Sequence, residues 1–314
     1  MGYDQDQIMP KFKIKPPEAG QRADVFVASQ LTEFSRSSLT GLFKDSHVSV
    51  NDQSAKPGYK LRAGDKLEID TSPLKIKPEV IDLPVIYEDA DVVVINKPAG
   101  LLTHSKGALN EEATVASWLL QHLKKTNHNI NSSFTGLNPV NAVNVSRLGI
   151  VHRLDRATSG VIITAKHAKA LDWLQKQFSQ RRTKKTYLAV VEGQLNPNEA
   201  LIDAPIGRHP KKPQTFKVQA SGKAAQTKYQ LLKSFTKDGQ PYSLVGLTPV
   251  TGRTHQIRVH LAYIGHPVVG DRVYGQSGED MLLHALSLEV VLPSQSRKIF
   301  KAPPPASFNK FIGS

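Results

Sequence analysis

Strand-like segments joined by short turns dominate the chain from residue 85 onward, and they constrain its fold more than any other feature. Apolar residues alternate with polar ones, or run together over a short stretch, at 91–97, 186–193, 228–235, 242–250, 255–263 and 281–292. Amphipathic helices are expected at 114–125 and 167–181. Many strands with few helices predict an α+β domain built on a mostly antiparallel, mixed β-sheet.

The first 84 residues have a different pattern. Residues 1–17 are polar and predict a loose arm or a first edge strand. Residues 18–70 hold two segments with helical spacing, 21–31 and 35–45, and then short strands, which together predict a small α/β domain. Ser35 is a candidate N-cap of the second helix. Residues 71–84 contain three prolines and predict a linker, so the larger domain is expected to span 85–314.

The chain is strongly basic, with 41 Lys and Arg against 27 Asp and Glu and a net charge of +14. Such a charge favours nucleic acid or an anionic membrane as the partner. No apolar run approaches the 18 or so residues of a spanning helix, and no helix has an all-basic polar face, so we expect no membrane contact. The charge gathers in 141–190, and in 207–237, which has no acid. Nucleic acid is therefore the expected partner.

Cysteine is absent, which excludes disulfides, thiolate nucleophiles and zinc sites that need sulfur. A chain without cysteine fits a reducing compartment, and the first residues lack the apolar core of a signal peptide, so a cytoplasmic location is expected. His255 and His260 are five apart, on opposite faces of the strand predicted there. We expect no metal and no other cofactor.

Residues 151–160, VHRLDRATSG, place one carboxylate, Asp155, between Arg153 and Arg156. The turn-prone residues 158–160 follow, and we expect them to shape the turn that presents the carboxylate. A strand-like run, VIITAK, comes next. A structural interpretation is an ion-paired aspartate, and a functional one is a catalytic carboxylate with a polyanionic substrate. The residues alone leave both open.

Five stretches together give this loop a context. GIVHRLDRATSGVIITAK (149–166) resembles the His-Arg-Leu-Asp-x-x-Thr-Ser-Gly signature of the RluA-type family of RNA pseudouridine synthases. Four more occur in that family's order: EDADVVVINKPAGLLTH, KKTYLAVVEG, TGRTHQIRVHLAYIGHPVVGDRVYG and LLHALSL. Residues 18–70 resemble an S4-like RNA-binding domain.

The resemblance implies both a fold and a reaction. The fold is a pseudouridine-synthase-type sheet with a central cleft, preceded by the S4-like α/β domain. In the reaction the N1–C1′ bond of a uridine in RNA breaks, the uracil turns, and C5 bonds to C1′. No atom is lost and no redox change occurs, so the resemblance implies no cofactor.

Three catalytic residues follow from the resemblance. Asp155 matches the catalytic carboxylate, which either attacks C1′ or removes a ribose proton. Arg253 matches the arginine that pairs with this acid, and a nearby cation favours the charged form of a carboxylate. Tyr187 matches the tyrosine that stacks on the uracil and assists removal of the C5 proton.

C1′ of a stacked uridine is out of reach, so the nucleotide must flip out of its helix. Arg153 matches the family's arginine that fills the vacated stack, and Arg156 is expected to contact phosphate. His152 is either an RNA contact or a structural histidine, and Leu283 either lines the uracil pocket or packs in the core. His255 and Gln256 are expected behind the reacting groups. Expected RNA contacts of the small domain are Arg22, Arg36 and Lys44.

Family members that begin with an S4 domain mostly modify large-subunit ribosomal RNA, so the resemblance favours ribosomal RNA over tRNA. The Asn-rich segment 126–144 lies beside the Asp155 loop in the sequence and is expected to be a surface loop. Two other functions remain open: a catalytically inactive RNA-binding assembly factor, and a glycosylase that frees the base. A monomer is expected.

Overall fold

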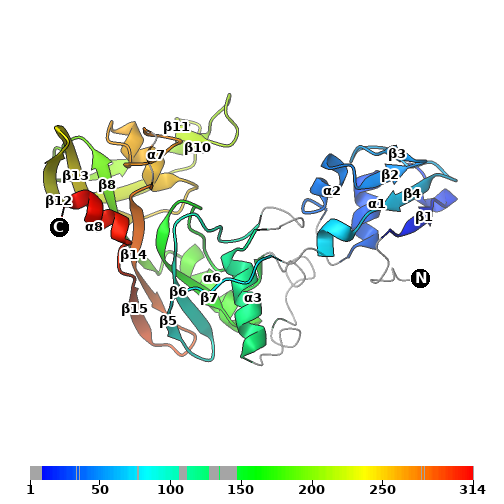
Figure 1. Ribbon diagram of the computed structural model, residues 1–314, viewed down its shortest axis with the longest axis horizontal. Coiled ribbons are helices and arrows are strands. Elements are labelled where there is room, and N and C mark those ends of the chain that lie inside the picture. The colour runs from blue at the N-terminus through cyan, green and yellow to red at the C-terminus, as the bar shows by residue number, and fades with distance from the viewer. Residues whose placement is uncertain are drawn as a thin grey trace. The chain divides into compact units, whose positions relative to one another are not determined.

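The computed structural model describes residues 9–313, except 33, 35, 76–77, 106–111, 127–133, 135–146, 277 and 279. The chain divides into two compact units (Figure 1): residues 1–82 with 104–148, and residues 83–103 with 149–314. The candidate cap Ser35 lies outside the described residues. So does the Asn-rich segment 126–144, apart from Thr126 and Phe134.

The first unit contains a four-stranded antiparallel sheet in the order β1-β4-β2-β3. Its apolar core includes Phe26 and Val27 of α1, Leu42 of α2 and Leu67 of β4. Residues 11–13, expected in an arm or edge strand, form the edge strand of this sheet. The elements are β1 (Lys11–Lys13), α1 (Ala23–Gln30), α2 (Thr40–Lys44), β2 (Val48–Val50), β3 (Gln53–Ser54), β4 (Lys66–Ile69) and α3 (Val115–Lys125), with 3₁₀ turns at Pro16–Glu18 and Ser72–Lys75.

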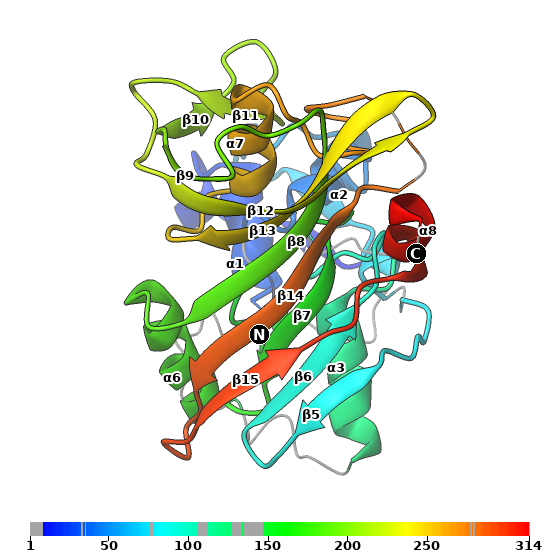
Figure 2. The same ribbon diagram turned by 90° about the vertical axis from the view of Figure 1, so that its left-hand side faces the viewer.

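The second unit is built on a nine-stranded sheet in the order β5-β6-β7-β14-β8-β13-β12-β9, with β15 paired to β14. Among the strand pairs of the described residues only β7 with β14 is parallel, so the predicted mixed, mostly antiparallel α+β architecture is confirmed (Figure 2). Its strands are β5 (Val85–Glu88), β6 (Val92–Lys97), β7 (Ser159–Ala165), β8 (Lys184–Glu192), β9 (Glu199–Asp203), β12 (Gln226–Lys237), β13 (Gln240–Pro249), β14 (Leu283–Val291) and β15 (Arg297–Lys301).

Three helices and a small hairpin complete the second unit. Helix α6 (Ala168–Ser179) contacts β7 and β14, and α7 (Gln256–Tyr263) contacts β12 and β13. The hairpin of β10 (Ile206–Arg208) and β11 (Phe216–Val218) also packs on α7. A short helix, α8 (Ala306–Ile312), ends the described chain.

The predicted strand at 255–263 is wrong, because this segment is the N-cap and body of helix α7. Ile257, Val259 and Leu261 alternate with polar residues, which is the pattern of a strand. The helix is buried on nearly every side, however, and the polar residues between them have their own buried partners. Without an exposed face, the sequence has no helical period. The argument that His255 and His260 lie on opposite faces of a strand fails with it.

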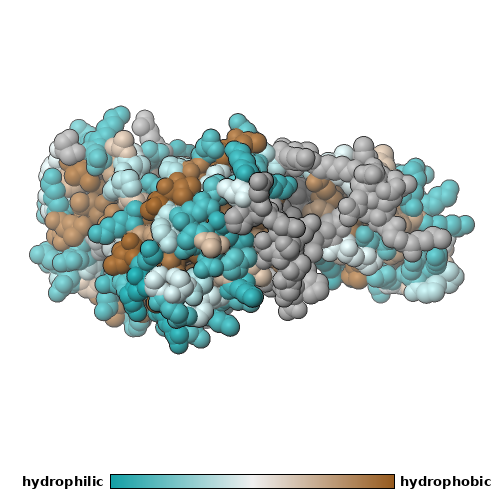
Figure 3. All heavy atoms as spheres, turned by 90° about the horizontal axis from the view of Figure 1, so that it is seen from below, coloured by the Kyte–Doolittle hydropathy of each residue, from teal (hydrophilic) through white to brown (hydrophobic). Residues whose placement is uncertain are grey.

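Hydrophilic residues cover much of the face drawn in Figure 3, interrupted by smaller apolar areas. Within the described part of the chain, no helix is both long and apolar enough to cross a bilayer.

Candidate active site

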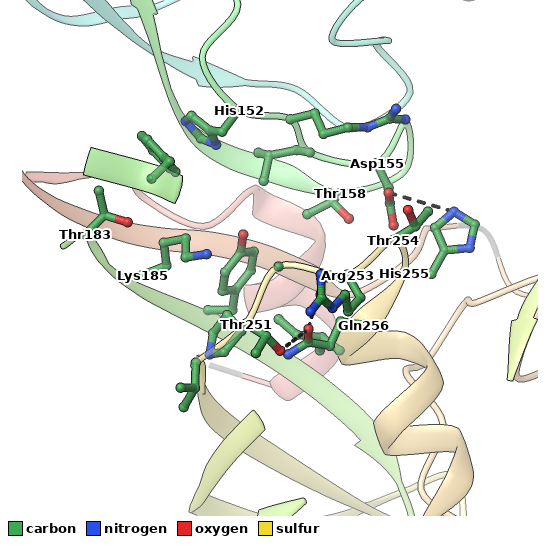
Figure 4. Close-up of a pocket in the computed structure, with 18 of the residues that line it drawn as sticks. His152, Asp155, Thr158, Thr183, Lys185, Thr251, Arg253, Thr254, His255 and Gln256 are labelled. Atoms are coloured by element: carbon green, nitrogen blue, oxygen red, sulfur yellow. Dashed lines mark hydrogen bonds and ion pairs between the residues drawn. The ribbon is translucent and has the colours of Figure 1, made fainter. Parts of the chain in front are cut away.

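A cavity of about 600 Å³ in the second unit gathers most of the predicted site residues (Figure 4). Its walls are the Asp155 loop, the start of β8, the turn before α7, and α7 itself. Segments far apart in the sequence therefore meet here. The predicted residues that line it are His152, Arg153, Asp155, Tyr187, Arg253, His255, Gln256 and Leu283.

A buried lysine at the end of β6 anchors the Asp155 loop through hydrogen bonds. The Nζ of Lys97 donates to the carbonyls of Pro98, Leu101 and Arg156, at 2.8, 2.9 and 3.2 Å. Burial lowers the pKa of Lys97 to about 7, although the Asp155 charge opposes this shift. The three carbonyls accept all the protons of an ammonium group, so Lys97 joins the turn after β6 to the loop.

Two further contacts fix the backbone around Asp155. The hydroxyl of Thr103 donates to the Leu154 carbonyl at 2.9 Å and accepts from the Leu154 N–H at 3.2 Å. The Thr158 N–H donates to the Asp155 carbonyl at 3.1 Å and closes the turn. Ser159 and Gly160 are already the first residues of β7, so the predicted turn over 158–160 lies earlier, over 155–158.

The arginine that binds Asp155 is Arg258, and the predicted pairing with Arg253 is wrong. Nη1 of Arg258 donates to Oδ2 of Asp155 at 3.2 Å. Arg253 also lines the cavity, but its Nε donates to the carbonyl of Ala224 at 3.0 Å. The reason is the helix: the N–H of Arg253 is bound in the turn that caps α7, and Arg258 lies in the helix itself.

Arg258 also binds a second, fully buried carboxylate. Its Nε and Nη2 donate to the two oxygens of Asp271, both at 2.7 Å. Burial alone would raise the pKa of Asp271, but the hydrogen bonds and charge of Arg258 outweigh it, so this pKa is lowered. For Arg258, burial opposes the charge, while Asp271 and Asp155 together raise its pKa. The guanidinium is therefore a fixed cation between two carboxylates.

Tyr187 lies in the middle of β8, opposite Leu247 of β13 and Ala285 of β14. Burial raises the pKa of its hydroxyl, and the Asp155 charge raises it further. The phenol is therefore neutral at physiological pH. Lys185, two residues earlier on the same side of the strand, also lines the cavity, and burial lowers its pKa. Sequence reasoning missed Lys185, although its spacing from Tyr187 was a usable signal.

The contacts of His152 favour the structural interpretation. Its Nε2 accepts the N–H of Ile163 at 3.1 Å, and its ring stacks on Phe178 with centroids 4.5 Å apart. Burial, with a smaller effect from Lys185, lowers the pKa of His152 to about 3. The ring is neutral and ties the Asp155 loop to β7.

The other predicted contacts differ in exposure. Arg153 is exposed and lines the cavity, whereas Arg156 is exposed but lies outside its lining. Leu283 meets both interpretations, because it lines the cavity and is also only 3% exposed within an apolar cluster.

In the first unit, Arg22 and Arg36 both bind the carboxylate of Asp24, at 3.0 and 2.9 Å. These hydrogen bonds, led by the one from Arg22, lower the pKa of Asp24 against the effect of burial. Each arginine keeps about half of its side chain exposed, and Lys44 at the end of α2 is exposed as well. The two arginines thus present a partly neutralised charge to solvent.

Gln256 fixes the turn that precedes α7. Its Oε1 accepts from the Thr251 hydroxyl at 2.6 Å and from the Arg253 N–H at 2.9 Å (Figure 4). Its Nε2 donates to the Gln226 carbonyl and the Thr227 hydroxyl. Among the residues that the structure describes, no group of three or more His, Asp or Glu could hold a metal ion.

Comparison with known proteins places this arrangement in one family. Residues 91–263 match the family model described as RNA pseudouridylate synthase. The chain is 40% identical over 282 residues to an uncharacterized RNA pseudouridine synthase of Aquifex aeolicus (strain VF5), with 88% of this chain and 84% of that protein covered. It is 35% identical to the ribosomal large subunit pseudouridine synthase D of Borreliella burgdorferi, with 98% and 93% covered.

A solved structure agrees with the sequence relatives. Human RNA Pseudouridylate Synthase Domain Containing 1 superposes with a TM-score of 0.57 at 28% identity, covering 72% of this chain and 85% of that one. The chain therefore belongs to the RNA pseudouridylate synthase family and is an isomerase that acts on RNA.

Proposed function

We propose that this protein converts uridine to pseudouridine in large-subunit ribosomal RNA, with Asp155 as its catalytic carboxylate. The observation that supports this most is the state of the two Asp155 oxygens. Arg258 binds Oδ2, whereas Oδ1 lies 3.8 Å from Nε2 of His255, which is beyond hydrogen-bond distance. The side chain is 19% exposed at the cavity, so Oδ1 is available to a substrate.

The reaction needs one carboxylate and no added reactant. Oδ1 either bonds to C1′ or removes a ribose proton, and the electron pair of the N1–C1′ bond leaves with the uracil. The detached uracil turns within the cavity and C5 bonds to C1′, after which the C5 proton is lost and N1 gains one. In the first route Oδ1 leaves C1′ as C5 arrives, and in the second it returns its proton to the ribose. Atoms and charge balance in both.

Tyr187 is proposed to support the uracil with its ring. Its raised pKa disfavours a phenolate, so it is poorly suited to remove the C5 proton as an ionised base. An aromatic ring beside the carboxylate can stack on the turning base, and its neutral hydroxyl can donate a hydrogen bond to a uracil oxygen.

Arg153 is proposed to enter the RNA helix when the uridine leaves it. A cavity with its carboxylate at the wall can be reached only by a nucleotide that has been flipped out. Arg153 is exposed, lines the cavity and is two residues from Asp155. Its planar guanidinium can stack on the bases that the uridine separates from.

The preference for ribosomal RNA rests on the relatives. Several carry the name ribosomal large subunit pseudouridine synthase D, at 32–38% identity to this chain. The predicted S4-like character of residues 18–70 and the basic side chains of Arg22, Arg36 and Lys44 are consistent with an RNA-binding first unit. A tRNA substrate is the alternative that the experiment below includes.

The test is tritium release from RNA labelled at uridine C5. Wild-type protein and the variants Asp155→Asn and Asp172→Asn are incubated with large-subunit rRNA transcripts and, separately, with bulk tRNA. We expect wild type and Asp172→Asn, which changes an exposed aspartate on α6, to release tritium from rRNA. Asp155→Asn should release none while binding the RNA as tightly.

Each other outcome contradicts a defined part of the proposal. An active Asp155→Asn variant would refute the role of the carboxylate, and release from tRNA alone would refute the substrate. Tight rRNA binding without release would favour an assembly factor. Nucleoside analysis of the digested RNA separates the isomerase, which leaves pseudouridine, from a glycosylase, which leaves free uracil.

A further inference from the structure

His255 approaches the oxygen of Asp155 that Arg258 leaves free. Its Nε2 lies 3.8 Å from Oδ1, as the dashed line in Figure 4 marks. Both side chains are about one-fifth exposed, so they face each other where water has limited access. At this distance the contact is electrostatic, and a small movement would make it a hydrogen bond.

A tyrosine hydroxyl contacts the other ring nitrogen of His255, Nδ1. The hydroxyl oxygen of Tyr274 lies 2.8 Å from Nδ1 of His255 and accepts the N–H of Phe216 at 3.0 Å. Phe216 supplies only a donor, so the hydroxyl proton of Tyr274 is available to Nδ1, the other partner that the structure gives it. When the hydroxyl donates this proton to Nδ1, a neutral imidazole carries its own proton on Nε2, which faces Asp155.

Burial, more than the surrounding charges, favours the neutral form of the His255 ring. Burial is the main cause that lowers the pKa of His255, and the cations Arg258 and Arg153 lower it further. Asp155 and Asp271 act in the opposite direction without reversing the shift. A neutral Nε2–H can donate to Oδ1 without transferring a proton to the carboxylate.

The backbone and ring of His255 are also held in place. His255 is the N-cap of α7 and has φ of +55°, a left-handed conformation in which histidine is enriched among non-glycine residues. Its ring packs edge-on against Phe216 and Tyr274, each with centroids 5.6 Å apart. The donor therefore has little freedom to turn away from the carboxylate.

We propose that His255 is a positioning residue for Asp155, and that Tyr274 holds it in the tautomer that donates to Oδ1. This rests on the proposed role of Asp155. With Arg258 on one oxygen and His255 on the other, the carboxylate cannot rotate freely about its Cβ–Cγ bond. The Tyr274 hydroxyl also links this pair to β11, because the N–H that it accepts belongs to Phe216.

The first test reads the tautomer and does not depend on activity. Long-range ¹H–¹⁵N spectra of histidine-labelled protein distinguish a protonated ring nitrogen from an unprotonated one, and His255→Gln identifies the His255 signals by their loss. We expect a proton on Nε2 in the wild type and a mixture of tautomers in Tyr274→Phe, which removes only the hydroxyl. A wild-type proton on Nδ1, or an unchanged spectrum in Tyr274→Phe, would overturn the proposal.

The second test uses single-turnover rates at saturating RNA. His255→Gln keeps an N–H near the position of Nε2 and His255→Leu has none, while both carry the same left-handed backbone cost. If His255 positions the carboxylate, the rate for His255→Leu should be about 10- to 100-fold lower, with an unchanged Kd for RNA. The rate for His255→Gln should stay within about threefold of wild type. Equal losses in the two variants would contradict a positioning role.

A double-mutant cycle decides whether Tyr274 acts through His255. Tyr274→Phe should slow the wild type, yet cause no further loss in the His255→Leu background. Additive losses would refute the link. If the wild type shows the expected tautomer but makes no pseudouridine from any RNA, the proposed function fails while the geometry of the pair holds.

Discussion

Replacing Arg258 by methionine removes its buried ion pair with Asp271, next to the candidate active site. The Arg258 side chain is 7% exposed and that of Asp271 is 0% exposed. In the variant, Asp271 keeps two backbone donors, the N–H groups of Val273 and Tyr274, but loses its cation. Removing one partner of a buried ion pair costs about 3–5 kcal/mol, so we expect the free energy of unfolding of the second unit to fall by this amount near neutral pH.

The loss should depend on pH in a defined direction. In the wild type the pKa of Asp271 is lowered, so its stabilising effect is present above the unfolded pKa and is lost as pH falls through the folded one. In Arg258→Met only the two backbone donors still oppose the effect of burial, so we expect the pKa of Asp271 to rise above its usual value. Lowering the pH then stabilises the variant relative to the wild type, by about 1.4 kcal/mol for each unit by which the raised pKa exceeds the pH.

Urea denaturation followed by tryptophan fluorescence measures the free energy of unfolding of the second unit in the wild type and the variant. The chain has two tryptophans, Trp118 in the first unit and Trp173 in α6 of the second. In a Trp118→Phe background the signal reports the second unit, where Trp173 donates from Nε1 to the Val291 carbonyl at 2.9 Å. Measurements at about pH 7.5 and about pH 4.5 give the two differences needed.

The control variant also removes the charge of Asp271 that Arg258→Met leaves without a cation. Arg258→Met with Asp271→Asn leaves an amide that needs no cation, so it should recover much of the stability lost near neutral pH. A loss below about 1 kcal/mol in Arg258→Met, or a loss that stays constant between the two pH values, would refute the reasoning, because Asp271 would then not depend on Arg258 for its charge.

Three further predictions use the same fluorescence assay. Lys97→Met leaves three loop carbonyls without their donor and should destabilise the second unit by about 3 kcal/mol or more; a loss under about 1 kcal/mol would contradict the assigned contacts. Because the folded pKa of His152 is about 3 and its usual value 6.5, the unfolded state binds more protons between them, so the wild type should lose up to about 2 kcal/mol between pH 7 and pH 5 that His152→Gln does not lose. Gly160 has φ of +116°, and a Cβ there would lie 2.2 Å from the Ala285 carbonyl oxygen, so Gly160→Ala should cost about 3 kcal/mol or prevent folding, and near-native stability would disprove the close approach.

The sheet was predictable where its strands are half or fully buried. The predicted segments at 91–97, 186–193 and 281–292 became β6, β8 and β14, because buried strands show the apolar pattern that a sheet requires. The short strands β10 and β11 were not predicted. Each has only three residues, which is too few to show an alternating apolar pattern in the sequence.

The sequence predicted which segments contribute to the candidate site, but not which side chains contact each other there. The loop around Asp155 and the strand with Tyr187 were identified from short motifs, since local spacing fixes a turn or the face of a strand. Tyr274 was not identified, because its contact with His255 joins residues 19 positions apart through the packing of α7. Such a partnership becomes visible only once the helix is known.

The choice between Arg253 and Arg258 shows what this limit means chemically. Both arginines lie in one motif, and only the fold tells which one faces Asp155. The fold also shows that the chosen cation is shared: Arg258 makes two contacts of 2.7 Å with Asp271 and one of 3.2 Å with Asp155. The shorter pair fixes the guanidinium, so its remaining nitrogen can hold one oxygen of Asp155 without fully neutralising the carboxylate. The proposed catalytic role of Asp155 is better served by this weaker contact than by a bidentate one.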